Sequence, residues 1–118
     1  MKTITTILLS LVSVTGLAQT PTTIPMWISQ RIQQFESAPI TNPPRSIWQY
    51  RYQGKIVYYF PPQCCDQFSE LYDQQGTRIC APDGGITGVG DGECPDFRNS
   101  RSQEKRIWKD TRSESPPK

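Results

Sequence analysis

The sequence predicts an α+β domain in which one N-terminal helix packs on an antiparallel sheet of about four strands, with a disulfide-tethered loop rich in glycine and aspartate. Three observations lead to this fold class. Apolar residues recur at helical spacing over residues 24–35, and aromatic and β-branched residues dominate residues 46–60. Five of the eight glycines then fall between Cys80 and Cys94.

The chain divides into four segments. Residues 1–18 are expected to be a cleaved export signal, because a lysine precedes a short apolar run that ends in small residues. We expect a flexible leader over 19–23, a single disulfide-stabilised domain over 24–112 and a disordered tail over 113–118. The apolar run is too short to span a bilayer comfortably, so no stable membrane insertion is expected after cleavage. The mature protein is therefore expected to be periplasmic or extracellular.

A helix is predicted after residue 23. Thr23 is the expected cap, Pro25 falls in the first turn, and Pro39 stops the helix. The apolar stripe of this helix comprises Ile24, Trp27, Ile28, Ile32 and Phe35.

A hairpin is predicted over residues 46–60, "SIWQYRYQGKIVYYF", with a two-residue turn at Gln53-Gly54. This register places Trp48, Tyr50, Tyr52 and Tyr59 on one side of the hairpin. Both sides are apolar enough to be buried, but only one can pack on the helix. The other is either covered by the rest of the chain or left as an aromatic platform, so these four residues are the candidates for a binding surface.

Two further elements follow. A second hairpin is expected to turn at "DQQG", residues 73–76, and "EKRIWKD" at 104–110 is expected to form an edge strand or a short helix.

Four cysteines in an exported domain predict two disulfides. A bond between the neighbours Cys64 and Cys65 would require strained peptide geometry. The favoured arrangement therefore joins these neighbours to Cys80 and Cys94, in one order or the other. Each bridge would close a loop of roughly 15 to 30 residues and contribute about 3 kcal/mol.

Composition excludes several kinds of chemistry. The chain contains no histidine, which removes imidazole catalysis and histidine zinc sites. With 13 basic and 11 acidic residues there is no electrostatic basis for binding nucleic acid. No catalytic residue is assigned, and the chain is not expected to be an enzyme.

The acidic residues of the glycine-rich stretch offer two alternatives. Asp83, Asp91 and Glu93 could provide the oxygen ligands that calcium takes, although the spacing is not that of an EF-hand. With Asp96 they could also provide the paired carboxylates of a small hydrolase, although a domain of this length has little room for an enclosing cleft. The simpler interpretation is that glycine and aspartate form tight turns, so no cofactor is expected and calcium stays an open alternative.

Several motifs between residues 25 and 112 resemble those of a family of small exported bacterial proteins, domain of unknown function 6970. They are the adjacent cysteines before an aspartate, "LYD", "CAPDGG", "GDG", "CPDF" and "IWKD". The resemblance implies export, a single domain and four cysteines that act as a set. It implies no activity.

These observations predict a protein-binding or inhibitor-like interaction module. The expected partner is another protein, contacted by the glycine-rich loop or by the second face of the first hairpin. A calcium-stabilised structural module and a small carboxylate-dependent hydrolase are the alternatives. The oligomeric state is left open.

Overall fold

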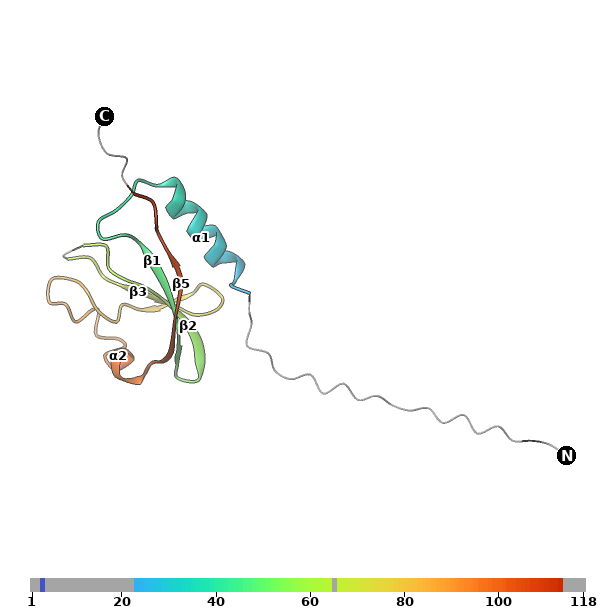
Figure 1. The fold of residues 1–118 in the computed structure, drawn as a ribbon. Coiled ribbons are helices and arrows are strands. Elements are labelled where there is room, and N and C mark those ends of the chain that lie inside the picture. The colour runs from blue at the N-terminus through green and yellow to red at the C-terminus, as the bar shows by residue number, and fades with distance from the viewer. Residues whose placement is uncertain (1–2, 4–22, 65, 114–118) are drawn as a thin grey trace.

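The structure, a computed structural model, describes residue 3, residues 23–64 and residues 66–113. It confirms the predicted α+β class, with helix α1 (Met26–Ser37) lying along an antiparallel sheet (Figure 1). The expected export signal lies outside the described residues apart from Thr3, as do most of the expected leader and tail.

The sheet has five strands rather than about four. They are β1 (Ser46–Tyr52), β2 (Lys55–Phe60), β3 (Glu70–Tyr72), β4 (Arg78–Cys80) and β5 (Ser102–Lys109). Their order is β4-β3-β2-β1-β5, with every neighbouring pair antiparallel. The additional strand is β5, which includes most of the segment 104–110 for which the sequence predicts an edge strand or a short helix. It pairs with β1, so β4 and β5 are the two edges of the sheet.

The predicted register of the first hairpin is confirmed. Trp48 pairs with Tyr59 and Tyr50 with Val57. The turn residues Gln53 and Gly54 both have positive φ, 51° and 74°, as a type I′ turn requires. Alternate residues of β1 and β2 therefore face opposite sides of the sheet, and both sides are covered.

Helix α1 covers one side, which we call the helix face. All five residues of the predicted stripe pack there against buried residues of the sheet, namely Ile47, Tyr58, Phe60 and Tyr72. The predicted cap at Thr23 is wrong, because the helix begins after Pro25, whose carbonyl accepts the Ile28 N–H at 3.0 Å. The helix has no side-chain cap at this end.

The C-terminal end of α1 is fastened to the chain that follows β5. The Arg112 guanidinium donates to the carbonyls of Glu36 at 2.8 Å and Phe35 at 3.0 Å in the last turn of the helix, where carbonyls run out of partners inside the helix. The Phe35 carbonyl also accepts the N–H of Ala38 at 3.1 Å. The Arg112 guanidinium also donates to the buried carboxylate of Asp110 at 2.8 Å. The hydrogen bond from Arg112 holds the pKa of Asp110 below its ordinary value.

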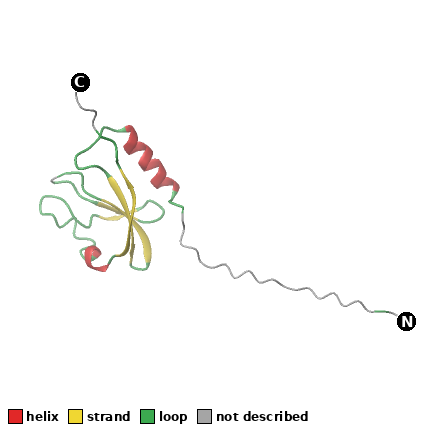
Figure 2. Ribbon diagram, in the orientation of Figure 1, coloured by secondary structure: helices red, strands yellow, loops and turns green. Residues whose placement is uncertain are grey.

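The opposite side, which we call the loop face, is covered by the irregular segment 81–101, which includes the short helix α2 (Phe97–Ser100) (Figure 2). Cys80 at the end of β4 is bonded to Cys94, with 6.2 Å between their Cα atoms. The predicted pairing of Cys80 and Cys94 with the adjacent cysteines is therefore wrong. Cys64 is also disulfide-bonded, whereas Cys65 lies outside the described residues.

Candidate functional site

The loop face is built around Phe97, a residue that the sequence did not single out. Its fully buried ring lies 5.5 Å from Tyr50, 5.3 Å from Tyr52 and 5.7 Å from Tyr59, measured between ring centroids. The three tyrosines are buried, and Trp48 packs beside them partly buried. The candidate binding surface of Trp48, Tyr50, Tyr52 and Tyr59 is thus not an open aromatic platform, because segment 81–101 covers it.

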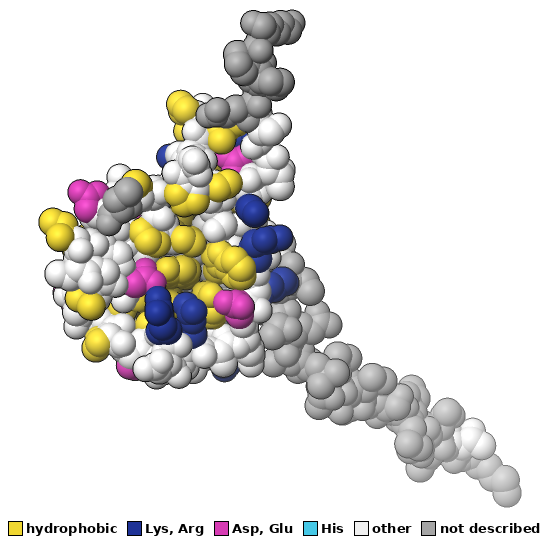
Figure 3. Space-filling view, turned by 60° about the vertical axis from the view of Figure 1, so that its left-hand side comes forward, with side chains coloured by type: hydrophobic (Ala, Val, Ile, Leu, Met, Phe, Trp, Pro, Cys, Tyr) yellow, Lys and Arg dark blue, Asp and Glu magenta, His cyan; other side chains and the backbone are white. Residues whose placement is uncertain are grey.

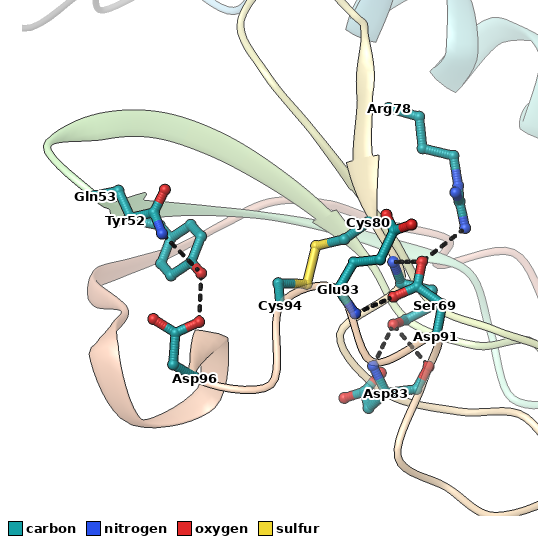
Figure 4. The surroundings of a disulfide bond; sticks show 11 residues. Tyr52, Gln53, Ser69, Arg78, Cys80, Asp83, Asp91, Glu93, Cys94 and Asp96 are labelled. Atoms are coloured by element: carbon teal, nitrogen blue, oxygen red, sulfur yellow. Dashed lines mark hydrogen bonds and ion pairs between the residues drawn. A yellow bond between two sulfur atoms is a disulfide. The ribbon is translucent and has the colours of Figure 1, made fainter.

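Each tyrosine hydroxyl on this face donates to a carboxylate. Tyr52 reaches Asp96, just before α2, at 2.6 Å (Figure 4). Tyr59 reaches Asp83 at 2.9 Å. Tyr50 reaches Glu104 of β5 at 2.6 Å. A buried phenol needs an acceptor, and these acids provide it.

Burial, followed by these hydrogen bonds, makes the phenols hard to ionise. The pKa of Tyr50 and of Tyr52 is raised to about 12. The pKa of Tyr59 is also raised, by burial first and by its hydrogen bond to Asp83 second. The phenols therefore stay neutral hydrogen-bond donors near neutral pH, and they attach the covering segment to the sheet.

Arg101 closes this cluster from the outside. Its guanidinium carbon lies 4.5 Å from the centroid of the Tyr50 ring and 5.2 Å from that of Phe97. A cation over aromatic rings is attracted by their negative faces. Figure 3 shows hydrophobic side chains gathered in the middle of this side of the molecule, with basic and acidic side chains around them.

The disulfide closes a loop over residues 80–94, and Asp91 fixes the base of that loop. The Asp91 carboxylate accepts the backbone N–H groups of Ala81 at 2.9 Å and Glu93 at 3.0 Å (Figure 4). The Asp91 N–H donates in turn to the Ala81 carbonyl at 3.0 Å. The hydrogen bond from Glu93 is the main cause that holds the pKa of Asp91 below its ordinary value.

Backbone contacts fasten the rest of the loop to the chain before β3. Ser69 is fully buried, and its hydroxyl lies 3.0 Å from both the N–H and the carbonyl of Asp83. Gly84 and Gly90 have φ of 83° and 72°, and a Cβ at either would collide with a backbone carbonyl, that of Gln67 or Ala81. The glycines thus allow the tight turns that the composition predicted.

The structure does not bring the three candidate calcium ligands into one cluster. Asp83 is engaged by Tyr59, Asp91 by backbone N–H groups, and Glu93 is exposed. Among residues 3, 23–64 and 66–113, no three acidic or cysteine side chains are arranged to hold a metal ion.

The tip of the 80–94 loop is apolar and projects into solvent. Ile86 is 91 % exposed and Val89 is 68 % exposed, and Phe68 beside the loop is 51 % exposed. Phe68 packs against Gly85, where a side chain would meet its ring. The folded domain therefore presents large apolar side chains on a loop whose backbone is held by a disulfide and hydrogen bonds.

Comparison with known proteins identifies a family and no individual relative. The family model described as Domain of unknown function (DUF6970) matches residues 33–110, most of the stretch whose motifs resemble that family. No curated protein and no solved structure matches the chain significantly. Within the described part of the chain, no helix combines the length and apolar character needed to cross a membrane.

Proposed function

The chain belongs to the family Domain of unknown function (DUF6970), and we propose that it is a protein-binding module whose contact surface is the tip of the 80–94 loop. The observation that carries the proposal is the exposure of Ile86 and Val89 on a loop that is fixed at its base. An exposed apolar patch commonly marks an interaction site.

The closed loop favours binding because little freedom is lost when a partner contacts it. Gly88 and Gly90 donate backbone hydrogen bonds within the loop at 3.1 and 3.0 Å, and Gly85 donates to Gln67 at 2.9 Å. Together with the disulfide, these bonds hold the loop in one shape before any partner arrives. A segment already ordered in its bound form gains affinity by avoiding the entropy cost of ordering.

The shape of the tip indicates the kind of partner. Ile86 projects almost entirely into solvent, so its apolar surface can be buried only if the partner provides a recess. We therefore expect a partner protein with an apolar pocket or cleft. An enzyme whose active-site cleft receives the loop would make this chain an inhibitor.

The carboxylates in the 80–94 loop and just after it support binding rather than hydrolysis. A carboxylic acid that donates a proton near neutral pH needs a raised pKa, and the pKa of Asp91 is lowered. Asp83 and Asp96 accept hydrogen bonds from buried tyrosines, which is a structural use.

The proposal includes export to the periplasm or the extracellular space. The Cys80–Cys94 disulfide supports it, because structural disulfides persist mainly in oxidising compartments.

The proposal can be tested by affinity capture with matched surface variants. Wild-type protein, the double variant Ile86→Ser/Val89→Ser and the variant Met26→Ser are immobilised and exposed to the native secretome. Met26 is the control, since it is also a large apolar residue, 77 % exposed, but begins α1 rather than the loop.

We expect the wild type and Met26→Ser to retain the same protein, and the double variant to retain at least about tenfold less, as expected when central apolar contacts are lost. Thermal melts of all three should coincide, because the substituted side chains are exposed. Equal capture by all three proteins, or no specific capture, would contradict the proposal.

A further inference from the structure

A cavity of about 230 Å³ lies between α1, the start of β1 and residues 60–70. Ile86 and Val89 of the loop tip do not line it, whereas Phe68 lines it and also packs against Gly85. Its lining combines two arginines, two glutamine amides and aromatic rings. This composition differs from the aromatic packing of the helix face around it.

Two arginines give the cavity its charge. The Arg31 guanidinium carbon lies 5.6 Å from the centroid of the Phe60 ring, and that of Arg45 lies 4.9 Å from the centroid of Phe35. The ion pairs among the described residues are Arg78–Asp91, Arg98–Asp83 and Arg112–Asp110, so neither of the two lining arginines has an acidic partner within 4.0 Å.

One acidic residue lines the same cavity. Glu70 accepts the Tyr72 hydroxyl at 2.7 Å, so part of its hydrogen-bonding capacity is already used. Two guanidinium groups against one carboxylate leave the lining with a net positive charge. The Arg45 guanidinium already donates one N–H to the Pro39 carbonyl at 3.5 Å. A guanidinium carries five N–H donors, so each arginine keeps donors that can bind an anion.

One buried oxygen of a partly exposed amide side chain adds an independent indication of a ligand. The Oε1 atom of Gln63 is buried and is the one such side-chain atom in the described chain without a hydrogen-bond partner. Gln63 also lines the cavity. Rotation of a glutamine amide by 180° exchanges its oxygen and nitrogen, so the same position can offer N–H donors to a bound oxygen.

From this arrangement we infer that the cavity binds a small organic carboxylate, with its charged group at Arg31, Arg45 and Gln63 and its apolar part against the aromatic lining. Guanidinium groups are suited to carboxylates because their paired N–H donors match the two oxygens. The rings of Phe35, Phe60 and Phe68 provide apolar walls that a bare inorganic anion would not use. The cavity is smaller than the roughly 300–1,000 Å³ of sites for drug-sized ligands, so the ligand is small.

The inference does not depend on the binding function of the loop. The cavity residues and the loop tip can be substituted separately, so failure of one proposal leaves the other standing.

The test is a titration of the oxidised full chain with 3-phenylpropionate, followed by NMR of the arginine Nε–H and glutamine amide groups. Two comparison probes are titrated in the same way: 3-phenylpropanamide, which is the uncharged amide of 3-phenylpropionate, and sodium sulfate. We expect saturable shifts at Arg31, Arg45 and Gln63 with a Kd on the order of 1 mM, as ligands of this size commonly reach. We expect the amide and sulfate to bind at least about tenfold more weakly.

A peptide that ends in phenylalanine offers the same carboxylate chemistry from a different source. Acetyl-Gly-Gly-Phe with a free C-terminus is therefore titrated beside its amidated form. Tighter binding of the free peptide than of 3-phenylpropionate would identify a chain end as the source. Weaker binding of the free peptide would identify a free small acid, rather than a chain end, as the source of the carboxylate.

Variants give a second readout. Arg31→Met, Arg45→Met and Gln63→Leu should each weaken binding of 3-phenylpropionate, the arginine variants by about tenfold. Arg106→Met is the matched control, because Arg106 is exposed on β5 and does not line the cavity. The inference is overturned if 3-phenylpropionate gives no saturable shift in the wild type, or if the amide or sulfate binds as well as the acid.

Discussion

The two faces of the sheet are buried against different kinds of structure. The helix face is covered by one regular element whose apolar stripe contacts the sheet along its length. The loop face is covered by an irregular segment that contributes one central ring, that of Phe97, and holds its position through the Cys80–Cys94 disulfide. Irregular backbone offers no continuous apolar stripe. The covering segment of the loop face is therefore held to the sheet by hydroxyl–carboxylate hydrogen bonds and a covalent link, whereas periodic apolar packing holds the helix to the other face.

The largest expected effect comes from removing the central ring of the loop face. Phe97→Ala should lower the free energy of unfolding by about 3–5 kcal/mol, because it leaves a cavity among three tyrosine rings. Urea denaturation measures the loss. Phe68→Ala is the control, since this ring is 51 % exposed and should cost far less. Equal losses for the two variants would show that Phe97 does not organise this face.

The disulfide should have the next largest effect. Cys80→Ala/Cys94→Ala should lower the free energy of unfolding by about 3 kcal/mol, because the bond joins two residues that are 14 positions apart in the sequence and so constrains the unfolded chain. The effect is measured by urea denaturation without reductant. Hydrogen exchange in the same variant should increase more at Ala81 and Asp91 than at amides of α1. A uniform increase over both faces would contradict the proposed division between them.

Paired tyrosine variants compare the two faces directly. Tyr52→Phe should lower the free energy of unfolding by about 1 kcal/mol, because the hydrogen bond to Asp96 is lost. Tyr58→Phe on the helix face should have almost no effect, since its hydroxyl has no hydrogen-bond partner among the described side chains and backbone groups. Thermal or urea unfolding of both variants tests this difference. The polar account of the loop face fails if Tyr58→Phe costs as much as Tyr52→Phe.

The smallest expected effect is that of tyrosine ionisation, which should leave the stability of the fold unchanged near neutral pH and lower it only at alkaline pH. All five tyrosines have raised pKa values in the folded chain, with burial as the first cause. Folding therefore suppresses phenol ionisation, and this contribution to stability is complete below the unfolded value of 10.0 and is lost as pH rises toward the folded values of about 12. Absorbance at the tyrosinate band should show no step centred at pH 10 in the folded protein. Such a step would contradict the burial of these hydroxyls.

The helix face could be predicted in detail because its signals are periodic. The stripe from Ile24 to Phe35 and the register set by the Gln53-Gly54 turn are both confirmed. The segment 104–110 stayed ambiguous because Ile107 and Trp108 are adjacent apolar residues among charges, which fit neither helical nor alternating spacing. Pairing with β1 made it a strand.

The loop face could be predicted only in part. Phe97 stands alone between Asp96 and Arg98, so no periodicity marks it. The cysteine pairing depends on turns at Gly84 and Gly90. These turns bring Asp91 within hydrogen-bond distance of Ala81, and Cys94 then lies beside Cys80.

One signal for the loop face was present in the sequence. The predicted register placed several phenols on one face, and buried hydroxyls need acceptors. The acids at 83 and 96 could have been assigned to those hydroxyls rather than to a metal or a reaction. Nothing in the spacing could have indicated the cavity at Arg31, Arg45 and Gln63, because it joins three separate segments.

The central claim is that the 80–94 loop is ordered before it meets a partner, and backbone relaxation of ¹⁵N-labelled protein tests it most directly. The amides of Gly85, Gly88 and Gly90 each donate to a backbone carbonyl, at 2.9, 3.1 and 3.0 Å. We predict order parameters near the value of about 0.85 that is typical of rigid backbone, similar to those of β1 and β2. Values below about 0.6 at these glycines, with β1 rigid in the same sample, would contradict the account.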